Sequence, residues 1–148
     1  MNAEHKQRDN EVGRTCACFN LRRAARLVTQ RFDEAFRELG LRATQLSVLT
    51  AVYHVSNPPL SKLAGTLGMD RTSLTRNLQV LQRKGLIVVK EGDDKRQRRI
   101  CITPEGERVL ASAFPIWRKV QTEVEEAIGA EKWDGLLTGL HEVARKFR

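Results

Sequence analysis

Side chains that can hydrogen-bond to base edges gather in residues 71–79. They are Arg71, Thr72, Ser73, Thr75, Arg76 and Gln79. Leu74, Leu78 and Leu81 recur at helical spacing, so a helix would bury these leucines at its rear and present the polar set outward. Arginine can bond guanine through two hydrogen bonds, glutamine can bond adenine in the same way, and hydroxyls can bond bases or phosphates. No acidic residue occurs in 71–90 to repel phosphate. The segment predicts a helix that reads a nucleic-acid groove.

A second basic segment lies in a polar loop between two short β-branched runs. The runs Leu86–Lys90 and Arg99–Ile102 predict the strands of a hairpin, joined by residues 91–98. The loop holds four further candidate contacts, Asp94, Lys95, Arg96 and Arg98. A basic tip can enter a minor groove, where negative potential favours arginine, and the Asp94 carboxylate can orient the Arg96 guanidinium. The alternative is a turn that happens to be charged.

The positive charge of the chain is concentrated around these two segments. The 148 residues carry a net charge of +8, and Leu60–Thr103 holds ten basic residues against four acidic ones. A positive patch on a nearly neutral scaffold is typical of a polyanion-binding protein. A solvated basic face is the alternative interpretation.

Other classes of protein find little support in the sequence. The histidines, His5, His54 and His141, are widely separated, and we find no Ser–His–Asp order, metal-ligand spacing or phosphate-cradling glycine loop. We therefore expect neither an enzyme nor a cofactor or metal site. No apolar run approaches the ~18 residues of a membrane span, and the first residues lack the apolar core of a secretory signal. A cytoplasmic protein without a membrane partner is expected.

The elements that must position the basic segments are mostly helices. In chain order we expect a disordered arm over residues 1–13, helices over 14–39, 43–54, 61–67 and 71–84, the hairpin, and two helices within 104–148, the first of them kinked by Pro115. Asp70 and Thr103 are the expected N-caps. The predicted fold is mainly α with a small β-hairpin wing, a winged helix-turn-helix over residues 41–103 within a single domain of residues 14–148. Ser61 and Lys62 of the short helix join the candidate contacts.

The two end regions, 14–40 and 104–148, carry long apolar stripes at helical spacing. Long stripes at both ends of a small chain indicate that these helices bury each other across a two-fold axis. We therefore expect a homodimer with double-stranded DNA as its other partner. Packing within one chain is the alternative for the end helices. For the winged helix, the alternative is a partner that is a protein and not DNA.

Several motifs of the chain occur together in one known family. They are Pro59-Leu-Ser-Lys-Leu-Ala, Leu-Gly-Met-Asp-Arg-Thr-Ser-Leu-Thr-Arg-Asn-Leu, Leu-Gln-Arg-Lys-Gly-Leu-Ile, Asp94-x-Arg96 and Ile102-Thr103-Pro-Glu-Gly106. The chain resembles the MarR family of bacterial regulators over nearly its whole length. The resemblance implies a homodimeric repressor on a pseudo-palindromic operator, with Arg96 in the minor groove and the polar face of residues 71–79 as its recognition surface.

The family resemblance also implies a small-molecule effector. Many members release DNA when a small, often phenolic or aromatic-acid ligand enters a cleft between the dimerisation helices and the winged domain. By position, the candidates for lining such a cleft are Arg22, Arg26, Tyr53 and His54. The alternative for Tyr53 and His54 is a place in the core or at its rim.

The cysteines offer an alternative mode of sensing. Cys16, Cys18 and Cys101 are too few for a disulfide framework. Cys18-Phe19 resembles the reactive pair of the family's organic-hydroperoxide-sensing branch, and a helix N-terminus near arginines favours the thiolate that can form a sulfenic acid. That branch has a tyrosine four residues after its cysteine, where this chain has Arg22. Thiol-based sensing through Cys18, with Cys16 as a second candidate, is therefore the alternative; the alternative for the thiol itself is a small buried hydrophobe.

Overall fold

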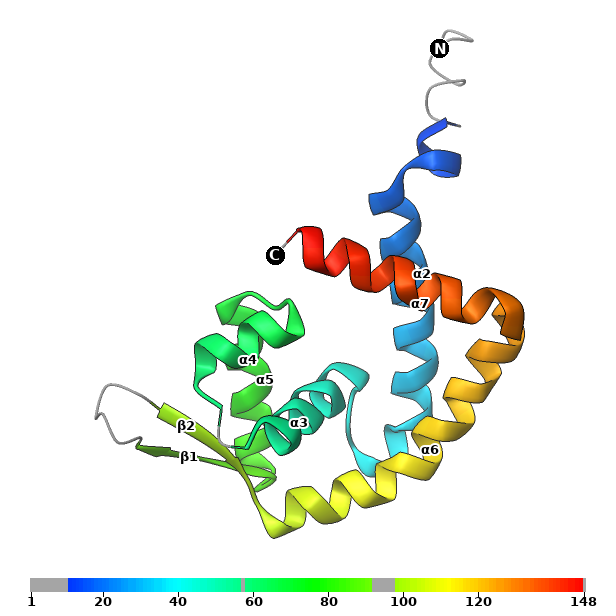
Figure 1. Ribbon diagram of the computed structural model, residues 1–148. Coiled ribbons are helices and arrows are strands. Elements are labelled where there is room, and N and C mark those ends of the chain that lie inside the picture. The colour runs from blue at the N-terminus through cyan, green and yellow to red at the C-terminus, as the bar shows by residue number, and fades with distance from the viewer. Residues whose placement is uncertain (1–10, 57, 92–97, 148) are drawn as a thin grey trace, which may run out of the picture.

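The structure is a computed structural model that describes residues 11–56, 58–91 and 98–147. Along the chain it contains α2 (Ala17–Ala35), a 3-10 turn η1 (Arg37–Leu39), α3 (Ala43–Val55), α4 (Leu60–Leu67), α5 (Arg71–Arg83), β1 (Ile87–Glu91), β2 (Arg98–Ile102), α6 (Pro104–Ile128) and α7 (Ala130–Lys146). The strands form one antiparallel hairpin in which Ile87 pairs with Ile102 and Glu91 with Arg98. The predicted fold class, mainly helical with a small hairpin, is confirmed (Figure 1).

The first helix differs from its prediction at both ends. Residues 11–15 are already helical, so the disordered arm predicted over 1–13 is wrong at 11–13, and residues 1–10 lie outside the described part of the chain. Cys16 then takes an extended backbone conformation and separates these residues from α2. α2 ends at Ala35 because Phe36 is buried and the chain tightens there into η1 before Gly40.

The core lies where α3, α4 and α5 meet the base of the hairpin and the first half of α6 (Figure 1). Leu49 of α3, Leu63 of α4 and Leu74 of α5 are all fully buried, and Ile87 and Ile100 close the core from the hairpin. Helix-turn-helix and hairpin therefore share one core, which fixes the direction in which α5 faces outward.

Helices α2 and α7 contribute little to this core. α2 packs against α6, where Arg31 donates two hydrogen bonds to the Glu123 carboxylate at 2.9 and 3.0 Å. Neither α2 nor α7 has a buried residue, and apolar side chains such as Leu27 and Leu140 remain exposed on them. Packing within one chain therefore leaves the apolar stripes of α2 and α7 largely uncovered, whereas part of the α6 stripe is buried. Within the described residues, no helix has the length and apolar character needed to cross a membrane.

Candidate nucleic-acid interface

Helix α5 presents the polar face that the sequence predicts. Leu74, Leu78 and Leu81 are buried beneath it. The exposed members of the polar set are Arg71, Thr72, Arg76 and Gln79, whereas Ser73 and Thr75 are half-buried. The helix can therefore offer two guanidinium groups, a hydroxyl and an amide to a groove, and these are the donor types that read guanine and adenine edges.

The start of α5 is fixed by an N-cap. The Asp70 carboxylate accepts hydrogen bonds from the Ser73 hydroxyl at 2.6 Å and from the Ser73 backbone N–H at 2.8 Å. The bond from the Ser73 hydroxyl, and then that from the Ser73 backbone N–H, hold the pKa of the Asp70 carboxyl below its usual value. The ionised cap therefore persists to lower pH than an ordinary aspartate would. The Thr75 hydroxyl likewise donates to the Arg71 carbonyl oxygen at 2.7 Å. Ser73 and Thr75 thus have local structural roles, and the four exposed side chains are the better candidates for base contact.

The other predicted contacts fall on α4 and the hairpin. Ser61 and Lys62 are exposed in the first turn of α4, and α4 contacts α5. The hairpin adds exposed Lys90 at the end of β1, which the site prediction did not include. Arg98 belongs to β2, but its side chain is outside the described part of the structure. Asp94, Lys95 and Arg96 also lie outside the described residues, so their roles stay predictions.

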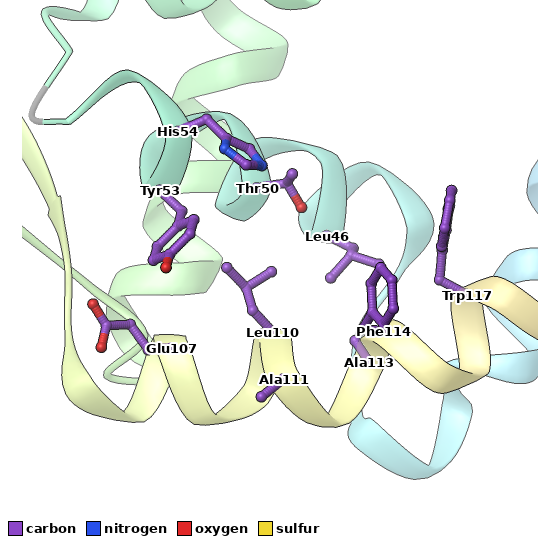
Figure 2. Close-up of a pocket in the computed structure, with 10 residues that line it drawn as sticks. All are labelled: Leu46, Thr50, Tyr53, His54, Glu107, Leu110, Ala111, Ala113, Phe114 and Trp117. Atoms are coloured by element: carbon purple, nitrogen blue, oxygen red, sulfur yellow. The ribbon is translucent and has the colours of Figure 1, made fainter.

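A pocket of about 390 Å³ opens between α3 and α6 (Figure 2). Its lining is mostly apolar and consists of Leu46, Thr50, Tyr53, His54, Glu107, Leu110, Ala111, Ala113, Phe114 and Trp117. Figure 2 shows the side chains of α3 facing those of α6 across the space, with Tyr53 and Glu107 toward one end and Trp117 at the other. The exposed ring of Phe114 stacks on Trp117 with 5.7 Å between centroids. Such a surface suits a flat aromatic ligand.

The pocket includes only half of the predicted effector residues. Tyr53 and His54 line it, and their rings meet edge to face with 5.5 Å between centroids. Arg22 and Arg26 are exposed on α2 and are not part of its lining. Arg118 provides a cation close by, because its guanidinium carbon lies 5.4 Å from the centre of the Trp117 ring. Sequence reasoning missed Leu46 and Thr50 of α3 and all the lining residues of α6. The apolar spacing of α6 is the same for a pocket wall as for a core helix.

The cysteines occupy three different environments. Cys16 is half-buried at the N-cap of α2, and Cys18 is exposed in the first turn of that helix. Cys101 is half-buried on β2, where its neighbour Ile100 faces the core. All three are free thiols.

Comparison with known proteins places this arrangement in a family. The sequence model of the MarR family matches residues 39–97. The crystal structure of the Mycobacterium tuberculosis transcriptional regulator MosR, in complex with DNA, is 40% identical in sequence, covers 88% of this chain and 95% of that one, and superposes with a TM-score of 0.81. The chain belongs to the MarR family.

Two further relatives support the assignment to this family of transcriptional regulators. The transcriptional repressor CouR, bound to a 23-mer DNA duplex, is 26% identical, with 90% of this chain and 95% of that chain covered and a TM-score of 0.81. The HTH-type transcriptional regulator YwoH of Bacillus subtilis is 25% identical over 88 residues. That match takes in 60% of this chain and 64% of YwoH, less than two thirds of its length.

Proposed function

We propose that this MarR-family chain is a non-catalytic transcriptional repressor that binds a pseudo-palindromic DNA duplex as a homodimer. The main support for this proposal is the outer face of α5. There Arg71, Thr72, Arg76 and Gln79 are exposed over a buried row of leucines. The absence of any acidic side chain in residues 71–90 keeps the field in front of this face positive. The DNA complexes of MosR and CouR support the same partner for this chain.

Alanine substitutions on α5 test this function. A duplex is first selected by the protein from a random-sequence pool. Arg71→Ala and Arg76→Ala are each expected to weaken binding of that duplex by about 1–3 kcal/mol, because a bidentate contact to guanine is lost. The measurement is fluorescence anisotropy of the labelled duplex at fixed salt. Lys119→Ala, which removes an exposed cation from α6, is the matched control and should change affinity little. Parent-like binding by both α5 variants would contradict the proposal.

The exposed apolar side chains of α2 and α7 support the homodimer. These helices belong to the predicted dimerisation regions, 14–40 and 104–148, and they expose among others Phe19, Leu27, Leu136 and Leu140. Burying such side chains is favourable by about 25 cal/mol per Å², which a second copy of the chain would supply. Sedimentation equilibrium should give twice the 16.8 kDa of the chain, and Leu140→Glu should shift the mass toward the monomer. A monomeric parent protein would remove the dimer from the mechanism.

For the effector we propose a small aromatic ligand in the pocket between α3 and α6. The support is the pocket itself, with Tyr53 and His54 on one wall and the stacked rings of Phe114 and Trp117 on the other. α6 also leads directly from the hairpin, so a ligand beside it is well placed to affect DNA binding. CouR from Rhodococcus jostii RHA1 has been solved with p-coumaroyl-CoA.

Thiol sensing is the second candidate, and the exposure of Cys18 in the first turn of α2 is the observation that favours it. An accessible thiol at a helix N-terminus can be oxidised to a sulfenic acid by an organic hydroperoxide. In contrast, Cys101 lies on the hairpin beside the core.

One displacement assay separates the two sensing mechanisms. Preformed protein–DNA complex is challenged with a panel of aromatic acids and, separately, with cumene hydroperoxide. A pocket effector should release the parent but not Phe114→Ala, whose ring no longer closes the pocket wall. Oxidation at Cys18 should release the parent but not Cys18→Ser. A complex that survives both panels would contradict both sensing proposals and leave DNA binding itself intact.

A further inference from the structure

The turn that follows α5 is hydrogen-bonded to Thr103, the N-cap of α6. The Thr103 hydroxyl donates to the carbonyl oxygen of Gly85 at 2.7 Å, and the Thr103 backbone N–H donates to that of Leu86 at 3.0 Å. Gly85 itself has a φ of +69°, a conformation that favours glycine. Two hydrogen bonds thus join the turn after α5 to Thr103, the residue just before α6.

The same threonine also caps α6. Its hydroxyl oxygen accepts from the Gly106 backbone N–H at 3.1 Å, and Gly106 lies so close to the Leu86 carbonyl that a Cβ there would be 2.2 Å from its oxygen. α6 therefore begins in backbone contact with the turn. A single hydroxyl serves both as acceptor for the cap and as donor for the turn.

A second contact joins the end of α5 to the other end region. The Lys84 ammonium donates to the Gly40 carbonyl oxygen, where η1 ends after α2. The end of α5 is therefore connected to both regions that carry the exposed apolar stripes. At its other end, α5 begins at Arg71 with Asp70 as its N-cap.

The geometry of α5 makes the angle at this turn important. Its 13 residues span about 20 Å at ~1.5 Å per residue. A tilt of about 10° at the turn would move the first residues of α5 by roughly 3.4 Å, which is the rise of one base pair. Small changes at the turn therefore translate into a shift of register on DNA.

We propose that Thr103 is a positioning residue, whose hydroxyl sets the angle between α5 and α6 and thereby the half-site spacing that a dimer of this protein accepts. The inference rests on the proposed DNA binding. Thr103 touches no base; it acts through Gly85 and the helix that precedes it. The bond to the Gly85 carbonyl is the part of its role that a helix cap alone does not require.

Three substitutions separate the two roles of the hydroxyl. Thr103→Ser keeps the donor and the cap. Thr103→Asp keeps a good N-cap acceptor, but an ionised carboxylate has no hydrogen to donate to Gly85. Thr103→Val removes both. Each variant is titrated against the duplex selected by the parent protein and against the same duplex with one base pair inserted between its half-sites.

The parent and Thr103→Ser should bind the selected duplex alike and discriminate against the longer one. Thr103→Asp and Thr103→Val should bind the selected duplex roughly threefold to thirtyfold more weakly and discriminate less between the two spacings. Parent-like affinity and discrimination in Thr103→Asp would overturn the inference, because the cap would then be the whole role. A loss that vanishes at higher salt would also overturn it, since screening removes a simple charge repulsion.

A measurement that needs no DNA distinguishes failure of the positioning role of Thr103 from failure of the proposed DNA binding. If the parent selects no duplex, the DNA-binding proposal fails, and amide hydrogen exchange still tests the positioning role. Exchange of the residue 103 amide, which is bonded to the Leu86 carbonyl, should be faster in Thr103→Asp than in the parent and Thr103→Ser. Equal exchange in all three would overturn the inference.

Discussion

Gly106→Ala is expected to destabilise the fold by about 3 kcal/mol, the upper part of the usual range for overpacking a core. A Cβ at this position would be 2.2 Å from the Leu86 carbonyl oxygen and 2.6 Å from Cγ1 of Ile102. The carbonyl belongs to the backbone and accepts the Thr103 N–H, so it cannot move aside without breaking that bond. The close approach of α6 to the hairpin therefore requires glycine.

Gly65→Ala is the matched control, because the same methyl group added in α4 meets no atom within 4 Å. This substitution should be neutral or stabilise the protein by up to about 1 kcal/mol, since alanine is the better helix former. Urea unfolding followed by far-ultraviolet circular dichroism measures both variants at one protein concentration. If Gly106→Ala were as stable as the parent, the close contact between α6 and Leu86 would be wrong.

Binding of the selected duplex is expected to weaken by a factor of about 10³–10⁵ between 50 and 200 mM salt, if a dimer neutralises roughly six to ten phosphates. The reason is release of counterions from the phosphates that basic side chains replace. The ten basic residues of Leu60–Thr103 give each protomer more than enough cations for such a contact. The slope of log K against log salt is the measured quantity.

Lys62→Ala sharpens this prediction. Lys62 is exposed in the first turn of α4, so we expect it to contact phosphate and not a base. Its loss should lower the slope by about one for each protomer and weaken all duplexes alike. Lys119→Ala should leave the slope unchanged. A parent protein whose binding does not respond to salt would contradict the basic face as a DNA-binding surface.

Helix α5 was predictable because its signals are local. Asp70 as N-cap and leucines at helical spacing define both its start and its buried side, and the structure confirms these features. The hairpin was equally clear from two β-branched runs around a polar loop. Its tip, with Asp94 and Arg96, lies outside the described residues, so the predicted minor-groove contact awaits a test.

The pocket was harder to predict because it depends on how distant helices cross. Phe114 and Trp117 follow the same spacing as core residues, and a single sequence does not show whether the space opposite them is filled. Arg22 and Arg26 were expected beside Tyr53, but α2 leaves both exposed and outside the pocket lining. The break at Cys16 was missed for a different reason, because neither adjacent residue, Thr15 or Ala17, is a proline or glycine.

The absence of buried side chains from α2 and α7 links the stability of this protein to its concentration in the cell. In the proposed homodimer, α2 and α7 bury most of their exposed apolar side chains against the second copy, so mass action makes the apparent melting temperature rise with concentration. Dissociation of the proposed homodimer on dilution would expose the apolar surfaces of α2 and α7 together and make the chain a better substrate for proteolysis. For such a protein, abundance is a determinant of its own lifetime.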